Sequence, residues 1–195
     1  MLYALLRNRP LLWLVLALPA LWNGWRWVVT PDEYGFGHAI GDSGLWSVWL
    51  LMATMAITPL RLMAGPGPLV AALARRRRDL GVASFAYAAL HTAIYLWDQG
   101  TLARIAAQVP QPEILAGWVT LALFVPLAIT SNDASVRWLR RGWRRLHRLV
   151  YPAAILTFVH WVLTAFDPAS AWAHAAALAA IELARVILQR RQRVT

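Results

Sequence analysis

The sequence contains no cysteine and no lysine, and only 14% of its residues are charged. Without cysteine, the chain has no disulfides, thiolate metal sites, iron–sulfur clusters or cysteine nucleophile. Apolar residues make up 59% of its 195 residues, which is more than a soluble domain of this size can bury. Twelve tryptophans agree with a membrane environment, because tryptophan collects at bilayer interfaces.

Six segments are long and apolar enough to cross a bilayer, for which about 20 residues are needed. They cover residues 10–29, 45–63, 80–97, 114–130, 146–166 and 171–188. We therefore expect an all-α integral membrane protein, a six-transmembrane-helix bundle that forms one domain over residues 1–195. The first segment follows basic residues, as a signal peptide does, but bulky Trp22 and Trp25 stand where a cleavage site needs small side chains. We expect it to be retained as an anchor.

The arginines predict the orientation of the bundle. If the N-terminus lies inside, every arginine except Arg26 and Arg104 falls on the inner side of the six spans. Cytoplasmic loops carry the basic excess of membrane proteins, so this distribution predicts an N-in/C-in topology. Although the net charge is +10, the arginines lie in short connections between apolar segments. That placement favours contact with anionic lipid over nucleic-acid binding, and we expect no nucleic-acid partner.

Two histidines stand at matched depth within predicted spans. His91 lies about 16 Å along the third segment and His160 about 20 Å along the fifth, measured from the inner side. An ionisable side chain inside a membrane is costly and indicates function. Two imidazoles on different helices can clamp a flat macrocycle, as in a low-spin b-type heme, and each Nδ1–H is then expected to bond a helix carbonyl. The alternative is that each histidine bonds a carbonyl and only fills space.

A second candidate site lies near the inner face. His147 stands 13 residues before His160, which on an ideal helix places the two about 140° apart, although Pro152 could kink or rewind that helix. Arg77 stands 14 residues before His91 and within about 40° of the same face. Arginine stays protonated and offers iron no lone pair, but it can hold a heme propionate or a flavin phosphate.

We expect structural roles for the remaining histidines and for the glutamate of the last segment. His38 lies in the first outer loop and His174 near the outer end of the sixth segment, so neither is deep in the membrane. Glu182 lies one helical turn from Arg185, with which it can pair. We expect surface or interface roles for the two histidines and an ion pair for Glu182.

Three stretches carry a resemblance to a known family: residues 51–60, 75–97 and 129–161. They resemble the heme-binding membrane subunits of bacterial periplasmic protein-methionine-sulfoxide reductase systems, MsrQ (formerly YedZ), within the ferric-reductase-like transmembrane group. The resemblance covers about residues 41–188. It implies heme b between the third and fifth helices of a bacterial inner-membrane protein. It also implies outward electron flow to a periplasmic catalytic subunit with a molybdenum cofactor.

The same resemblance assigns site residues. His91, His147 and His160 match the ligand positions of the family, whereas Arg77 stands where the wider group has a second histidine of the third helix. We favour a second, more weakly held heme beside His147, with an inner donor site as the alternative. FMN and quinol are both suggested carriers or donors in the family. The donor partner is then the quinone pool or a cytoplasmic flavin reductase.

Two rival functions stay open at this point. One is a stand-alone transmembrane ferric or cupric reductase of the same fold. The other is a heme-free membrane scaffold or transporter. No GxGxxG or Walker pattern occurs, so we expect the electrons to come from a partner or a small molecule, and we expect no catalytic residue in this chain.

Overall fold

The computed structural model describes residues 2–194, with side chains up to residue 192. In chain order its elements are α1 (Leu2–Arg7), α2 (Arg9–Val29), α3 (Phe36–Ala64), α4 (Pro68–Gln99), α5 (Leu102–Gln108), α6 (Pro112–Ile129), α7 (Asp133–Leu139), α8 (Arg141–Leu146), the 3-10 turn η1 (His147–Leu149), α9 (Val150–Thr164) and α10 (Ala169–Val194). Six helical stretches can cross a membrane by length and composition: α2, α3, α4, α6, the run Arg141–Thr164, and Ala169–Gln192 of α10. The predicted six-span, all-α architecture is confirmed.

The helices begin and end differently from the predicted spans. Both α3 and α4 start well before the apolar runs at residues 45 and 80, because glycines and arginines there continue the helix beyond the apolar segment. His38 therefore lies in the first turn of α3. The prediction that His38 lies in a loop is wrong. The fifth span is interrupted by η1, so Pro152 sits in the first turn of α9, where its missing N–H is tolerated, and does not kink the helix interior.

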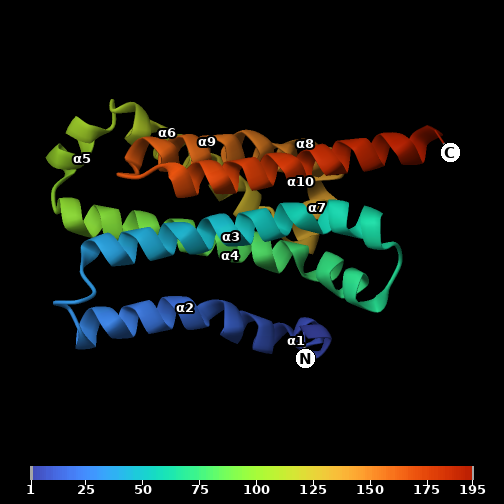
Figure 1. The fold of residues 1–195 in the computed structure, drawn as a ribbon, viewed down its shortest axis with the longest axis horizontal. Helices are drawn as coiled ribbons and strands as arrows, with labels where there is room; N and C mark the ends of the chain where they lie inside the picture. Colours follow the sequence, from blue (N-terminus) through green and yellow to red (C-terminus); the bar gives the residue numbers. More distant parts are fainter. Residues whose placement is uncertain (1, 195) are drawn as a thin grey trace.

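The bundle has two sides around a central pair of helices. In Figure 1, α3 and α4 run side by side, with α6, α9 and α10 along one side and α2 along the other. One apolar cluster joins α3 to α6, α9 and α10 and includes Leu51, Phe124, Phe158 and Leu178. A second joins α3, α4 and α2 and includes Leu50 and Tyr87. Val48 and Phe124 of the first cluster also line the cavity described below.

Polar side chains attach the peripheral helix α2 to α4. The hydroxyl of Tyr87 donates to the carbonyl of Leu16 at 2.7 Å and accepts from the amide of Ala20 at 3.1 Å. These two backbone groups would otherwise bond each other, so the hydroxyl is inserted into the hydrogen-bond ladder beside Pro19. Near the other end of α2, the buried carboxylate of Asp79 accepts from Arg9 Nε at 2.9 Å and from Trp13 Nε1 at 3.2 Å.

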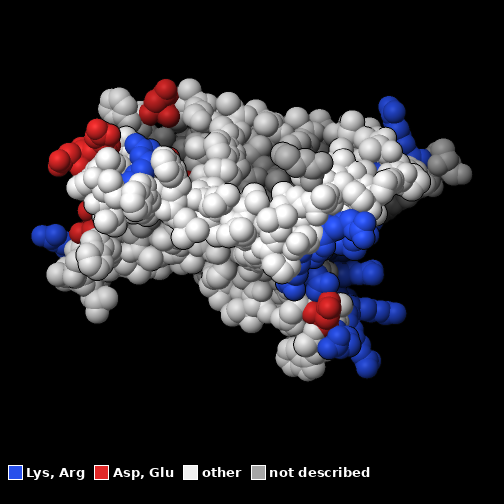
Figure 2. Space-filling model, turned by 90° about the horizontal axis from the view of Figure 1, so that it is seen from below, with Lys and Arg blue, Asp and Glu red and all other residues white. Residues whose placement is uncertain are grey.

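Charge separates along the long axis of the molecule. Figure 2 shows arginines gathered toward one end and most acidic side chains toward the other, with an uncharged belt between them. At the acidic end, the buried Tyr34 donates to Asp42 at 2.9 Å and lies under the guanidinium of Arg26. Burial and the neighbouring Asp42 carboxylate raise the pKa of Tyr34 above its ordinary value. The uncharged belt is the surface expected of a multi-pass membrane protein.

Candidate functional site

A cavity of about 540 Å³ lies among α3, α4, α6 and α9, next to the start of α10. This volume is within the range of ordinary ligand and cofactor pockets, about 300–1,000 Å³. Its walls are mostly apolar, with hydroxyl groups from Ser47, Thr92, Tyr95 and Thr120 among them. The cavity also contains the only two histidines that the sequence places deep in spans.

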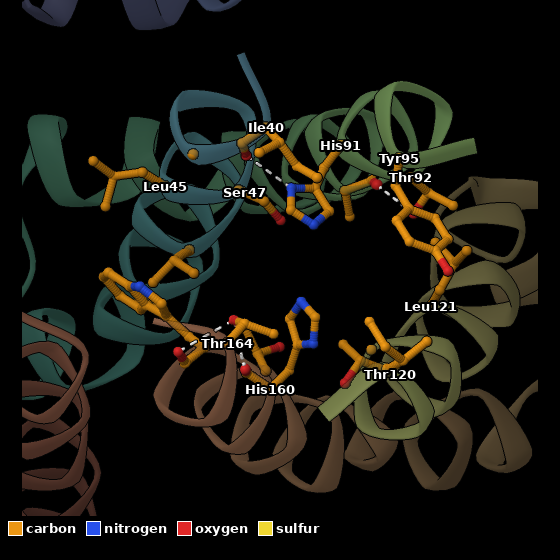
Figure 3. Close-up of a pocket in the computed structure, with 18 of the residues that line it drawn as sticks. Ile40, Leu45, Ser47, His91, Thr92, Tyr95, Thr120, Leu121, His160 and Thr164 are labelled. Carbon is orange, nitrogen blue, oxygen red and sulfur yellow. Dashed lines mark hydrogen bonds between the residues drawn. The ribbon is translucent and has the colours of Figure 1, made fainter. Parts of the chain in front are cut away.

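His91 and His160 face each other across this cavity from α4 and α9. Their ring centroids are 6.0 Å apart and their planes are perpendicular, at 90°. Figure 3 shows each ring with one nitrogen turned toward the opposite ring. The structure therefore brings together the two residues whose depths in the sequence match.

The other nitrogen of each ring is bonded to a neighbouring helix. Nδ1 of His91 lies 2.9 Å from the carbonyl oxygen of Ile40 on α3, and Nδ1 of His160 lies 2.7 Å from that of Glu113 on α6. A carbonyl only accepts, so both Nδ1 atoms carry the proton and both Nε2 atoms keep a free lone pair. The expected bond from Nδ1–H to a helix carbonyl is confirmed for both rings.

One hydroxyl in the cavity wall lacks a partner. The buried Oγ1 of Thr120 on α6 makes no hydrogen bond. By contrast, the hydroxyls of Thr92, Thr157 and Thr164, which also line the cavity, each donate to the carbonyl four residues earlier. An unpartnered buried hydroxyl is costly, so Thr120 is available to a polar atom of a ligand.

A chain of hydrogen-bonded side chains links the cavity wall to the short helix α5. Tyr95, on the cavity wall, donates to Gln108 of the short helix α5 at 2.9 Å. Gln108 in turn donates to Gln99 at the end of α4, at 2.6 Å. These bonds hold α5 beside the C-terminal end of α4.

His147 and Arg77 do not line this cavity. Nε2 of His147 lies 3.1 Å from Oγ1 of Thr130, and its ring stacks on Trp143 with centroids 3.9 Å apart. Arg77 donates to Thr58 on α3 at 3.2 Å. Thr130 and Thr58 are thus polar partners of the two predicted residues.

The residues expected to be structural do make structural contacts. Exposed His38 stacks on Tyr34 with centroids 5.6 Å apart. His174 accepts from Trp49 Nε1 at 3.1 Å and donates to the carbonyl of Ser170 at 2.8 Å. The predicted pair of Glu182 and Arg185 is confirmed at 2.7 Å, and Arg185 also donates to Tyr151.

Sequence reasoning missed the backbone carbonyls of Ile40 and Glu113 and the hydroxyl of Thr120. Neither carbonyl has a sequence signal, because every residue except proline offers the same backbone groups. Thr120 sits in an apolar run like other threonines of the spans, and only its missing partner distinguishes it. These groups become recognisable only once the rotation of each helix about its axis is known.

Comparison with known proteins places the chain in a family. Residues 43–158 match the family described as the ferric reductase like transmembrane component; the match includes His91 and His147 and ends two residues before His160. The protein-methionine-sulfoxide reductase heme-binding subunit MsrQ of Xanthomonas campestris pv. campestris (strain B100) is 43% identical over 129 residues, which are 64% of this chain and 57% of that protein. This chain thus spans little more than half the length of that relative.

Two further relatives of the same name are covered more fully. MsrQ of Xanthomonas axonopodis pv. citri (strain 306) is 39% identical over 154 residues, which are 75% of this chain and 69% of the relative. MsrQ of Brucella ovis (strain ATCC 25840) is 40% identical over 155 residues, which are 77% and 67%. No solved structure matches the chain. The chain therefore belongs to the ferric-reductase-like transmembrane family and, within it, to the MsrQ group.

Proposed function

We propose that this protein is the heme-binding membrane subunit of a methionine-sulfoxide reductase system. It would carry electrons through heme b across the bacterial inner membrane to a periplasmic catalytic subunit that holds a molybdenum cofactor. The observation that carries the proposal is the opposed pair of His91 and His160, each with a free Nε2. The partner is supported by the names of the relatives, which are heme-binding subunits of protein-methionine-sulfoxide reductases.

The cavity fits a heme by three observations. Centroids 6.0 Å apart leave room for one metal–nitrogen bond of about 2 Å on each side. Two opposed imidazoles, each with a lone pair on Nε2, would hold the iron of a heme between them. The unpartnered hydroxyl of Thr120 offers a hydrogen bond to a polar substituent.

The residues of the chain act by holding and shielding the cofactor. The carbonyls of Ile40 and Glu113 fix the tautomer and orientation of His91 and His160, and they raise the basicity of each Nε2. Apolar side chains around the pair keep water away. A heme held by both histidines would supply one-electron relay, and the partner would reduce methionine sulfoxide.

We place the arginine-rich end of the bundle in the cytoplasm, with N-in/C-in topology, following the positive-inside rule. The donor, a quinol or a reduced flavin such as FMN, would then act near Arg77 and His147. His147 would ligate a second, more weakly held heme, while Arg77 would pair with a propionate or with a flavin phosphate. The position of both side chains outside the lining of the histidine cavity supports a site separate from it.

Optical spectroscopy of the purified protein tests the central heme. We expect a Soret band with a low-spin b-type spectrum, which His91→Ala and His160→Ala abolish or severely reduce. His38→Ala and His174→Ala are the matched controls, because they also remove an imidazole but lie outside the cavity, and they should keep the spectrum. Full heme content in His91→Ala would refute the assignment.

Reoxidation of the reduced protein tests the partner. After reduction with dithionite, the heme should be reoxidised by the periplasmic methionine-sulfoxide reductase only when a sulfoxide substrate is present. If ferric chelates alone reoxidise it equally well and the reductase has no effect, the chain is instead a metal reductase.

A further inference from the structure

Two glycines lie against the two cavity histidines. A Cβ added to Gly44 on α3 would stand 3.1 Å from Nδ1 of His91, and one added to Gly117 on α6 would stand 3.0 Å from Nδ1 and Cε1 of His160. Both distances are shorter than an ordinary van der Waals contact. Among the other glycines of the chain, only Gly81 has any atom within 4 Å of such a Cβ, the methyl group of Thr54 at 3.7 Å.

The two glycines occupy the same position relative to the carbonyl that each histidine binds. His91 bonds the carbonyl of Ile40, four residues before Gly44, and His160 bonds that of Glu113, four residues before Gly117. Residues four apart on an α-helix lie one above the other on the same face. Each imidazole is therefore held at Nδ1 by a carbonyl and packs on the bare backbone one turn further along the same helix.

Helix propensity alone would disfavour both glycines. Glycine in a helix interior is destabilising relative to alanine, since it loses more backbone freedom on folding. The imidazole torsion χ2 is broad and nearly two-fold, so the backbone does not by itself fix the plane of the ring. A close contact on one side, together with a hydrogen bond at Nδ1, restricts that rotation.

We propose that Gly44 and Gly117 are positioning residues that hold the imidazole planes of His91 and His160 perpendicular. The inference rests on the proposed function, because the consequence of the geometry is read from the bound heme. Perpendicular axial imidazoles give ferric low-spin iron a highly anisotropic electron paramagnetic resonance spectrum, whereas near-parallel planes give a rhombic one. A methyl group at either glycine must push the ring away and lengthen its bond to the carbonyl, which lowers the basicity of the ligand.

The test compares four alanine variants of the full-length heme-loaded protein. We expect the wild type to give the highly anisotropic spectrum. Gly44→Ala and Gly117→Ala should shift it toward the rhombic form and raise the reduction potential. Gly37→Ala, in open space on α3, and Gly81→Ala, on α4 in ordinary contact with Thr54 of α3, are the matched controls and should leave both readouts unchanged.

The outcomes separate this inference from the proposed function. A wild type without heme refutes the proposed function. The positioning role is refuted, and the proposed function is not, if Gly44→Ala and Gly117→Ala bind heme and keep wild-type spectra and potentials. The same conclusion follows if the Gly37→Ala and Gly81→Ala controls shift equally.

A rescue experiment covers the case in which Gly44→Ala does not retain heme. The double variant His91→Gly/Gly44→Ala is then supplied with free imidazole, as is His91→Gly alone. A ring without a covalent tether can move by the few tenths of an ångström that the methyl group requires. Equal heme recovery in both supports the positioning role, and recovery only in His91→Gly contradicts it.

Discussion

Replacing Asp79 by asparagine should destabilise the protein without removing its heme. Asp79 is 5% exposed in α4, at the centre of contacts from Arg9, Trp13 and Arg76. Asparagine has nearly the same shape but carries no charge, and its amide group would face a donor of Arg76, 3.5 Å from the carboxylate in the native protein. The substitution therefore tests the charge of this contact rather than its packing.

The expected loss in the free energy of unfolding follows from how exposed each partner of Asp79 is. The side chain of Arg9 is 65% exposed, so its pair with Asp79 contributes little, about 0–1 kcal/mol. The bond from Trp13 to a charged acceptor contributes about 1.5–3 kcal/mol and keeps roughly half of that with a neutral acceptor. Together with the lost attraction of Arg76, the loss is about 2 kcal/mol. For a protein of this size that lowers Tm by about 4–8 °C.

Thermal unfolding in detergent, followed by tryptophan fluorescence, measures this effect. The matched control is Asp133→Asn, because Asp133 pairs with neighbouring Arg78 at 2.6 Å but is 74% exposed. Arg78 holds the pKa of Asp133 below its ordinary value, so their contact persists at neutral pH and is lost only as the pH falls through that lowered pKa. Its removal should give no resolvable shift in Tm. Equal shifts in the two variants would refute the reasoning from burial.

Two further predictions concern topology and the inner site. Reporters inserted after Gly65 and Asn132 should read cytoplasmic and those after Gly100 and Asp167 periplasmic; the reverse pattern would overturn the orientation. His147→Ala should lower the heme-to-protein ratio while part of the low-spin spectrum remains, and unchanged heme content with loss of donor-dependent reduction would indicate a donor site instead.

Hydropathy predicted the six spans because a membrane helix is specified locally, by about 20 apolar residues in a row. The starts of α3 and α4 escaped this prediction, since glycines near the start of α3 and the arginine run 75–78 of α4 lower the hydropathy of segments that are still helical. The division of the fifth span by η1 was equally invisible, because Pro152 signals a break without saying where it falls.

Helix depth predicted that His91 and His160 would meet, because depth needs only the residue count from a common membrane face. It did not predict that their planes are perpendicular or that Gly44 and Gly117 press against them. Those features depend on how α3 and α6 are rotated against α4 and α9. The contacts of Asp79 with α2 likewise depend on where a helix distant in sequence docks.

The sequence by itself determined that the protein lies in lipid, how many spans it has, that the arginines gather at one end of the bundle and how deep two histidines lie. Each of these is a property of one segment at a time. Only the tertiary structure decided which helix faces meet. That decision places the carbonyls of Ile40 and Glu113 on the imidazoles and leaves Thr120 without a partner. The physical reason is that side-chain packing selects the rotation and register of neighbouring helices, and packing between distant segments has no local signature in the chain.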